Sequence, residues 1–241
     1  MTSQLTDPVN DRMPTDEAML TALIDSQRRM IGFLREADES TGDTPVAATP
    51  AWSVRNLAAH VLSVGTMITT GGDWGDDPQI VVDREVAARA DHTLAQLADE
   101  WEEMLATLEN IPLGPGASVL LVDAITHEYD MRSALGPEYH SRTIGVPEGL
   151  SALVAWVRHQ NLVEQKIEFR TPTSVAAFGD GPAVTTVDVA DDWELMRILG
   201  VRRSVAQLEA LPREGDIDPL IAITSRYPHP VNPLETDYPA A

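Results

Sequence analysis

The chain of 241 residues contains no cysteine. This absence excludes disulfides, cysteine-ligated metals, iron–sulfur clusters and a cysteine nucleophile, so any thiol chemistry requires a thiol supplied from outside. Lysine is almost absent as well, because Lys166 is the single one. It lies in the polar stretch KIEFR, and we therefore set aside chemistry that depends on a lysine Schiff base.

Basic residues and long apolar runs are also scarce. The chain has 17 basic and 38 acidic residues, which gives a formal charge of -21. A negative field of this kind repels nucleic acids and anionic membranes. No apolar run approaches the ~20 residues of a membrane span. The N-terminal stretch MTSQLTDPVNDRMPTDE lacks the basic and apolar regions of a signal peptide. We expect a cytoplasmic protein that binds neither nucleic acid nor membrane.

Common catalytic motifs are missing too. The sequence has no GxGxxG and no GxxxxGK[ST], the patterns of dinucleotide and P-loop binding, and no GxSxG. His127 and Glu128 begin like the zinc protease motif HExxH, but Met131 stands where the second histidine belongs. A protease of that class is excluded.

Amphipathic helical patterns fill the first part of the chain. A hydrophobic content of 43% is enough to form a core. Residues 1–14 look disordered, and residues 39–50 look like a linker. Apolar spacing predicts helices over residues 15–37, 53–72, 82–110 and 118–135. Four such helices predict a bundle over residues 15–140.

The pattern changes after residue 145. Residues 147–164 predict a further helix, and the stretches KIEFR, SVAAF and AVTTVDV predict short strands. Helical spacing returns over 193–199 and 204–211, and the proline-containing tail from Tyr227 looks irregular. Residues 141–241 therefore predict a small α+β domain, and the whole chain is assigned to the α+β class.

Three polar residues lie on stripes of helix that should face the core. Asp123 and His127 are one turn apart, and His60 lies on an apolar face of the helix at 53–72. Two imidazole nitrogens and one carboxylate oxygen, with coordination positions left open, suit catalytic Zn²⁺ or another divalent first-row metal. Glu128 and Asp130 are expected to accept hydrogen bonds that fix the imidazole tautomer.

A structural interpretation without metal stays open. A lone histidine on an apolar stripe, such as His60, is commonly a hydrogen-bonded core residue. Asp123 requires a partner inside an apolar run, and His127 alone could be that partner. The remaining histidines have no companion at ligand spacing and are assigned surface or structural roles; they are His92, His140, His159 and His229.

Three segments carry a family resemblance. AWSVRNLAAHVLSVG (51–65) resembles the W-[ST]-V-R-[DN]-L-x-x-H helix of the mycothiol-dependent maleylpyruvate isomerase family. LVDAITHEYDMRSALG (121–136) resembles the second metal helix of that family, with its H-x-x-D-x-R-x-A-L continuation. WELMRILGVRRSVAQLEAL (193–211) is similar to its C-terminal segment, in which we interpret Arg202 and Arg203 as a fold signature.

The resemblance implies an N-terminal DinB-like four-helix bundle with a divalent metal, usually zinc, and a smaller α/β C-terminal domain. It implies that His60, Asp123 and His127 are the metal ligands. The chain departs from the family at Asp123, where the isomerases have Glu. Because Asp is one methylene shorter, the metal would lie nearer the helix at 118–135, or the carboxylate would bind through water. Arg226, in ITSRYPHP, is matched to the substrate-contacting arginine of the isomerases.

The resemblance also implies a function. Mycothiol, the low-molecular-weight thiol of actinobacteria, would be the cosubstrate or cofactor of an isomerase or S-transferase that acts on a small electrophilic substrate. Arg132 and Arg226 are the expected catalytic residues, because arginines at the entrance would reverse the local negative field. We expect a monomer or homodimer. The alternatives are a non-catalytic bundle that binds a small ligand and a metal-dependent hydrolase.

Overall fold

The computed structural model describes residues 15–110, 117–182 and 184–231. They form two compact units. One is the described part of Leu20–His140, and the other is the described part of Ser141–Glu235 together with residues 15–19. The disorder expected for residues 1–14 lies outside the described residues. No described helix combines the length and the hydropathy that a membrane span requires.

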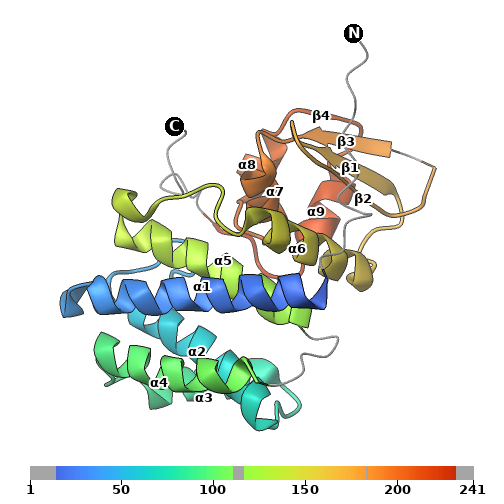
Figure 1. Ribbon diagram of the computed structural model, residues 1–241. Coiled ribbons are helices and arrows are strands. Elements are labelled where there is room, and N and C mark those ends of the chain that lie inside the picture. Colours follow the sequence, from blue (N-terminus) through green and yellow to red (C-terminus); the bar gives the residue numbers. More distant parts are fainter. Residues whose placement is uncertain (1–14, 111–116, 183, 232–241) are drawn as a thin grey trace. The chain divides into compact units, whose positions relative to one another are not determined.

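Helices make up the first unit (Figure 1). The long ones are α1 (Asp16–Glu36), α2 (Val54–Thr70), α4 (Leu94–Leu108) and α5 (Ala117–Leu135), and α3 (Pro78–Ala88) is shorter. Short 3-10 turns cover Glu39–Asp43 and Pro137–Tyr139. Because α2 packs against α3, α4 and α5, it is the central helix of this unit. The bundle of four long helices agrees with the prediction.

The single helix predicted over residues 82–110 is wrong, since the chain forms α3 and α4 there. A capping box starts α4: the Thr93 hydroxyl accepts from the Gln96 N–H at 3.1 Å, and the Gln96 side chain accepts from the Thr93 N–H at 2.8 Å. Such a box satisfies N–H groups that lack a partner at a helix start. The pattern T-x-x-Q was present in the sequence and marks this boundary.

The core of the bundle lies between α2 and α4. Leu57 and Leu62 of α2 and Leu97 and Trp101 of α4 are each 0% exposed. The Trp101 indole N–H donates to the Gln27 side-chain oxygen at 3.1 Å, so its one polar atom has a partner inside the core. α1 is thereby tied to α4.

The second unit contains a small sheet and several helices. Its strands are β1 (Lys166–Arg170), β2 (Val175–Phe178), β3 (Val184–Asp188) and β4 (Arg213–Glu214), in the order β2-β1-β3-β4. β1 pairs antiparallel with β2 and parallel with β3, and β3 pairs antiparallel with β4. Alternate residues such as Ile167 and Phe169 are buried. The α+β class is confirmed.

The helices of this unit differ in part from the prediction. α6 (Val146–Gln160) ends four residues before the predicted position 164, because the next residue, Asn161, adopts a left-handed backbone with φ of 47°. α7 (Asp192–Leu199) and α8 (Val205–Glu209) lie close to their predicted ranges. The short α9 (Asp218–Thr224) and β4 were not predicted, because elements of this length carry too little periodicity to be recognised.

Arg203 of the GVRRS segment donates to both carboxylate oxygens of Glu194, at 2.7 and 2.6 Å. The Arg203 side chain is almost fully buried, and the pair ties the turn after α7 to that helix. This contact is consistent with the interpretation of the segment as a fold signature.

We expect Leu57→Ala to lower the free energy of unfolding by about 2–5 kcal/mol, because it opens a cavity in the fully buried centre of α2. Urea unfolding followed by circular dichroism measures the change. Ile80→Ala is the control, because Ile80 is 67% exposed and its loss should cost less than about 0.5 kcal/mol. Equal effects of the two substitutions would contradict this description of the core.

Candidate metal centre

The start of α2 is fixed two turns before His60. Ser53 is the N-cap: its hydroxyl accepts from the Asn56 N–H at 3.4 Å, while the Asn56 side chain accepts from the Ser53 N–H at 3.1 Å. This capping box fixes where the helix begins and so which residues face inward. His60 is accordingly buried at the inner face.

His60, Asp123 and His127 converge in the bundle. The Asp123 Oδ1 lies 3.3 Å from the His60 Nε2 and 3.6 Å from the His127 Nε2, and the three ligand atoms all lie within 4.8 Å of one another. The two residues of α5 are one turn apart, so both project from one side of that helix. The structure thus brings together the three residues predicted to bind metal.

The donor set fits a divalent metal. Bonds of 2.0–2.2 Å in a tetrahedral zinc site place ligand atoms roughly 3.3–3.6 Å apart, and the distances of Asp123 Oδ1 from the two imidazoles, 3.3 and 3.6 Å, have this size. The shorter side chain of Asp123 therefore reaches both histidines. Two nitrogens and one oxygen leave positions open for a further ligand.

Electrostatics favour the metal-binding form of His127. Burial lowers the pKa of His127, and the neighbouring His60 lowers it further, while Asp123 and a hydrogen bond to Asp130 oppose the shift. The net direction is downward, so the imidazole is neutral at neutral pH and keeps a lone pair for a metal. Its Nδ1 lies 3.1 Å from the Asp130 Oδ2, so Asp130 occupies the expected place behind the ligand.

Glu128 does not have the predicted role of orienting an imidazole. Its carboxylate accepts from the Arg29 guanidinium at 2.8 and 2.7 Å, from Arg132 at 2.9 and 2.7 Å, and from the Ser26 hydroxyl at 2.7 Å. Residues adjacent on a helix point about 100° apart, so Glu128 and His127 face different neighbours. The buried Glu128 instead joins α1 to α5.

Arg132 uses its guanidinium in the ion pair with Glu128 and in further contacts nearby. Besides Glu128, it donates to the Tyr139 carbonyl at 2.6 Å, and its guanidinium lies 4.7 Å from the centre of the Phe33 ring. The side chain is almost fully buried. These contacts position α5, and the proposed catalytic role of Arg132 stays a prediction.

Arg226 lies in the second unit, two residues after α9. It donates to the carbonyls of Ile223 and Leu199, and it stacks on Trp156 with its guanidinium carbon 4.7 Å from the ring centre. Its Nε is buried and has no hydrogen-bond partner among the described residues. Burial lowers the pKa of Arg226 to about 10, so the group keeps its positive charge at neutral pH.

Trp52 is a neighbour of the cluster to which sequence reasoning gave no role. Its ring centre lies 4.6 Å from that of His60 and 6.1 Å from that of His127. The signal was the tryptophan at the start of the segment AWSVRNLAAHVLSVG, eight residues before His60. An aromatic residue directly before a helix cap can reach two turns along that helix.

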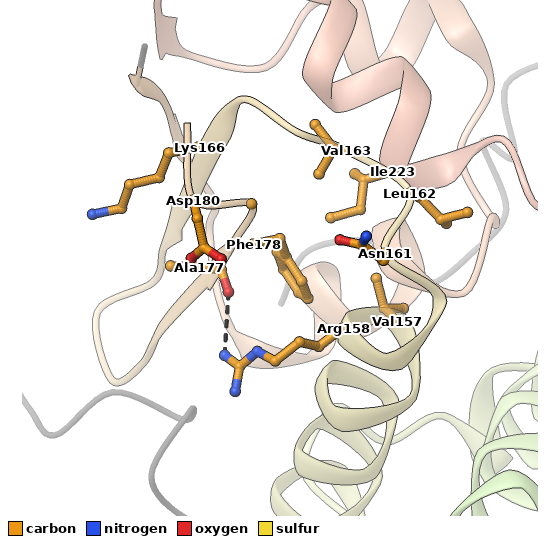
Figure 2. Close-up of a pocket in the computed structure, with 11 residues that line it drawn as sticks. Val157, Arg158, Asn161, Leu162, Val163, Lys166, Ala177, Phe178, Asp180 and Ile223 are labelled. Atoms are coloured by element: carbon orange, nitrogen blue, oxygen red, sulfur yellow. Dashed lines mark hydrogen bonds between the residues drawn. The ribbon is translucent and has the colours of Figure 1, made fainter. Parts of the chain in front are cut away.

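A cavity of about 480 Å³ lies in the second unit (Figure 2). Its walls come from the end of α6, from β1 and β2 and from α9, and Arg158 at its edge donates to the Ala177 carbonyl at 3.2 Å. None of the predicted site residues lines it. The cavity and the metal cluster therefore share no residue.

A family model matches the part of the chain that contains the cluster. Residues 23–132, which include His60, Asp123 and His127, match the family model described as the mycothiol maleylpyruvate isomerase N-terminal domain. No curated protein matches the chain.

Solved structures extend the similarity over most of the chain. A crystal structure of the mycothiol-dependent maleylpyruvate isomerase is 14% identical, with a TM-score of 0.57, and the match covers 93% of this chain and 99% of that one. A mutant of the isomerase in which alanine replaces one histidine matches with 13% identity, the same TM-score of 0.57 and the same coverage. At this identity the likeness concerns the fold.

We expect Glu128→Ala to lower the free energy of unfolding by about 3–5 kcal/mol. The substitution removes the carboxylate shared by Arg29 and Arg132, so their positive charges lose this counter-charge. Chemical denaturation measures the loss. Glu102→Ala is the control: Glu102 is exposed and pairs with the exposed Arg35, so its loss should cost at most about 1 kcal/mol. An unchanged free energy of unfolding in Glu128→Ala would contradict the role of Glu128 in joining α1 to α5.

Proposed function

Because residues 23–132 match the model of the mycothiol maleylpyruvate isomerase N-terminal domain, we propose that the chain is a metal-dependent enzyme that uses mycothiol either to isomerise a small electrophilic substrate or, as an S-transferase, to join the thiol to it. The observation that carries the proposal is the convergence of His60, Asp123 and His127 within 4.8 Å. We further propose that the enzyme is cytoplasmic and acts as a monomer or homodimer.

We propose zinc as the ion, because three protein ligands with an open position are typical of catalytic zinc. A divalent ion bound there would supply Lewis acidity, under which a coordinated thiol loses its proton at neutral pH. His60 and His127 would bind it through Nε2 and Asp123 through a carboxylate oxygen. Asp130 would hold the His127 ring in one tautomer through Nδ1.

The absence of cysteine decides where the sulfur comes from. Because the chain has no thiol of its own, an external thiolate would add to one carbon of a conjugated cis double bond, and the electron pair would move to the carbonyl oxygen. Rotation about the resulting single bond, re-formation of the double bond and departure of the thiolate give the trans isomer without an oxidant or reductant. If the C–S bond persists and the carbon is protonated, the reaction is an S-transfer.

We propose that Arg226 binds an anionic group of the substrate. Its guanidinium is charged, and no carboxylate pairs with it among the described residues, so an anionic substrate group would supply the missing counter-charge. Arg132 would act indirectly, because its donors are engaged with Glu128 and Tyr139.

The proposal predicts about one bound divalent ion per chain in protein purified without chelators, measured by plasma mass spectrometry. His60→Ala and Asp123→Ala should each lose most of it, because each removes one of three ligands. His92→Ala is the matched control from the same unit, since the His92 side chain lies outside the cluster, with its Nε2 3.9 Å from a Glu100 carboxylate oxygen. A metal-free wild type, or metal retained by both cluster variants, would favour a non-catalytic binding bundle.

Activity should also depend on the thiol. We expect cis–trans isomerisation of maleylpyruvate, or mycothiol conjugation of an electrophile, to stop when mycothiol is removed. Turnover that persists without any thiol would favour the hydrolase alternative. The same assay tests Arg226: Arg226→Lys should raise KM for an anionic substrate at least tenfold without loss of metal, because Lys lacks the bidentate donor geometry. Arg213→Lys, which changes an exposed arginine bonded to the Glu209 carbonyl, should have no effect.

A further inference from the structure

We propose that Trp52 is a positioning residue for His60, and that stacking on its indole, in place of a hydrogen bond, fixes the plane of this imidazole. The inference rests on the proposed metal site. The two rings lie 4.6 Å apart between centres, with their planes inclined by 34°. Offset or tilted aromatic pairs at this distance attract each other beyond the apolar area they bury.

The two histidines of the cluster are held in different ways. The Nδ1 of His127 has the Asp130 carboxylate at 3.1 Å. The Nδ1 of His60 is buried and has no hydrogen-bond partner among the described residues. Histidines that bind metal almost always use their second nitrogen to contact an acceptor that fixes ring orientation. His60 lacks this contact at its Nδ1, so packing must hold that side of the ring.

Trp52 is itself well anchored for this task. Its backbone N–H donates to the Thr49 carbonyl at 2.8 Å, and its own carbonyl accepts from the Val46 N–H at 3.0 Å. Val46 is fully buried. Ser53, the residue after Trp52, is the N-cap of α2 and pairs with Pro45 in an isolated bridge. Residues 44–50, the second part of the segment expected to be a linker, thus form hydrogen-bonded turns that anchor Trp52.

The geometry explains why the indole can act on one ligand more than on the other. The His127 ring lies farther from the indole, at 6.1 Å with an inclination of 50°. The His60 and His127 rings are nearly perpendicular, 4.8 Å apart at 79°, so an indole stacked on His60 cannot stack on His127 as well. The indole limits rotation of the His60 ring and keeps its Nε2 near the Asp123 Oδ1, at 3.3 Å.

The test compares zinc affinity in Trp52→Leu and Trp52→Phe by competition with a chromogenic chelator. Leu keeps the apolar bulk but has no flat ring, so we expect about tenfold weaker binding, as for loss of a contact that orients a ligand. Phe retains a ring and should bind zinc within about twofold of the wild type. Trp74→Leu is the matched control, because it makes the same change at a half-buried tryptophan of the same unit.

A second measurement separates positioning from general loosening. In metal-free protein, nitrogen-detected NMR of the imidazoles should show the His60 signals shifted or broadened in Trp52→Leu, with the His127 signals unchanged. Wild-type zinc affinity in Trp52→Leu, or equal perturbation of both histidines, overturns the proposal. If the wild type binds no zinc, the proposed function fails, while the NMR comparison in metal-free protein still decides whether Trp52 orients His60.

Discussion

The cost of keeping a carboxylate and two imidazoles inside a helical bundle is the constraint on which the site depends. A carboxylate surrounded by apolar side chains is strongly unfavourable unless partners compensate its charge. Asp123 meets this requirement through Nε2 atoms on two different helices, so α2 and α5 must approach each other at one defined register. The capping box at Ser53 sets that register on the α2 side. The same three donors, once gathered, have the composition of a catalytic divalent-metal site.

The buried carboxylate of Glu128, one residue after His127, has a different task. The Glu128 carboxylate pairs with Arg29 and Arg132 and accepts from the Ser26 hydroxyl. It thereby connects α5 to α1, whereas Asp123 connects α5 to α2 through His60. Because successive helical residues point about 100° apart, one short stretch of α5 serves the metal centre and the scaffold at once. The division has a consequence for Arg132, whose bonds make it part of the scaffold that holds the ligands in place.

The likeness to a solved isomerase at 14% identity shows that this fold persists while most side chains change. Within that fold this chain places three possible metal donors: a histidine after the capped start of α2, and an acid and a histidine one turn apart on α5. It differs in the acid, where the isomerase family resemblance leads one to expect Glu. The distances from Asp123 to both histidines show that the shorter side chain is accommodated.

Several features followed from the sequence alone. Apolar periodicity gave α1, α2, α5 and the α+β class, because these long elements repeat their pattern over several turns, and one-turn spacing placed Asp123 and His127 on a common face. The boundary between α3 and α4 was also encoded locally, because the T-x-x-Q cap at Thr93 marks it although apolar periodicity continues across it. Other features required the tertiary structure. Rotation about the axis of α5 decides that Asp130, and not Glu128, is the partner of His127. The pairing of Arg29 and Arg132 with Glu128 and the position of the Trp52 indole against His60 depend on how separate segments pack together. Such contacts are fixed by packing, which no local pattern encodes.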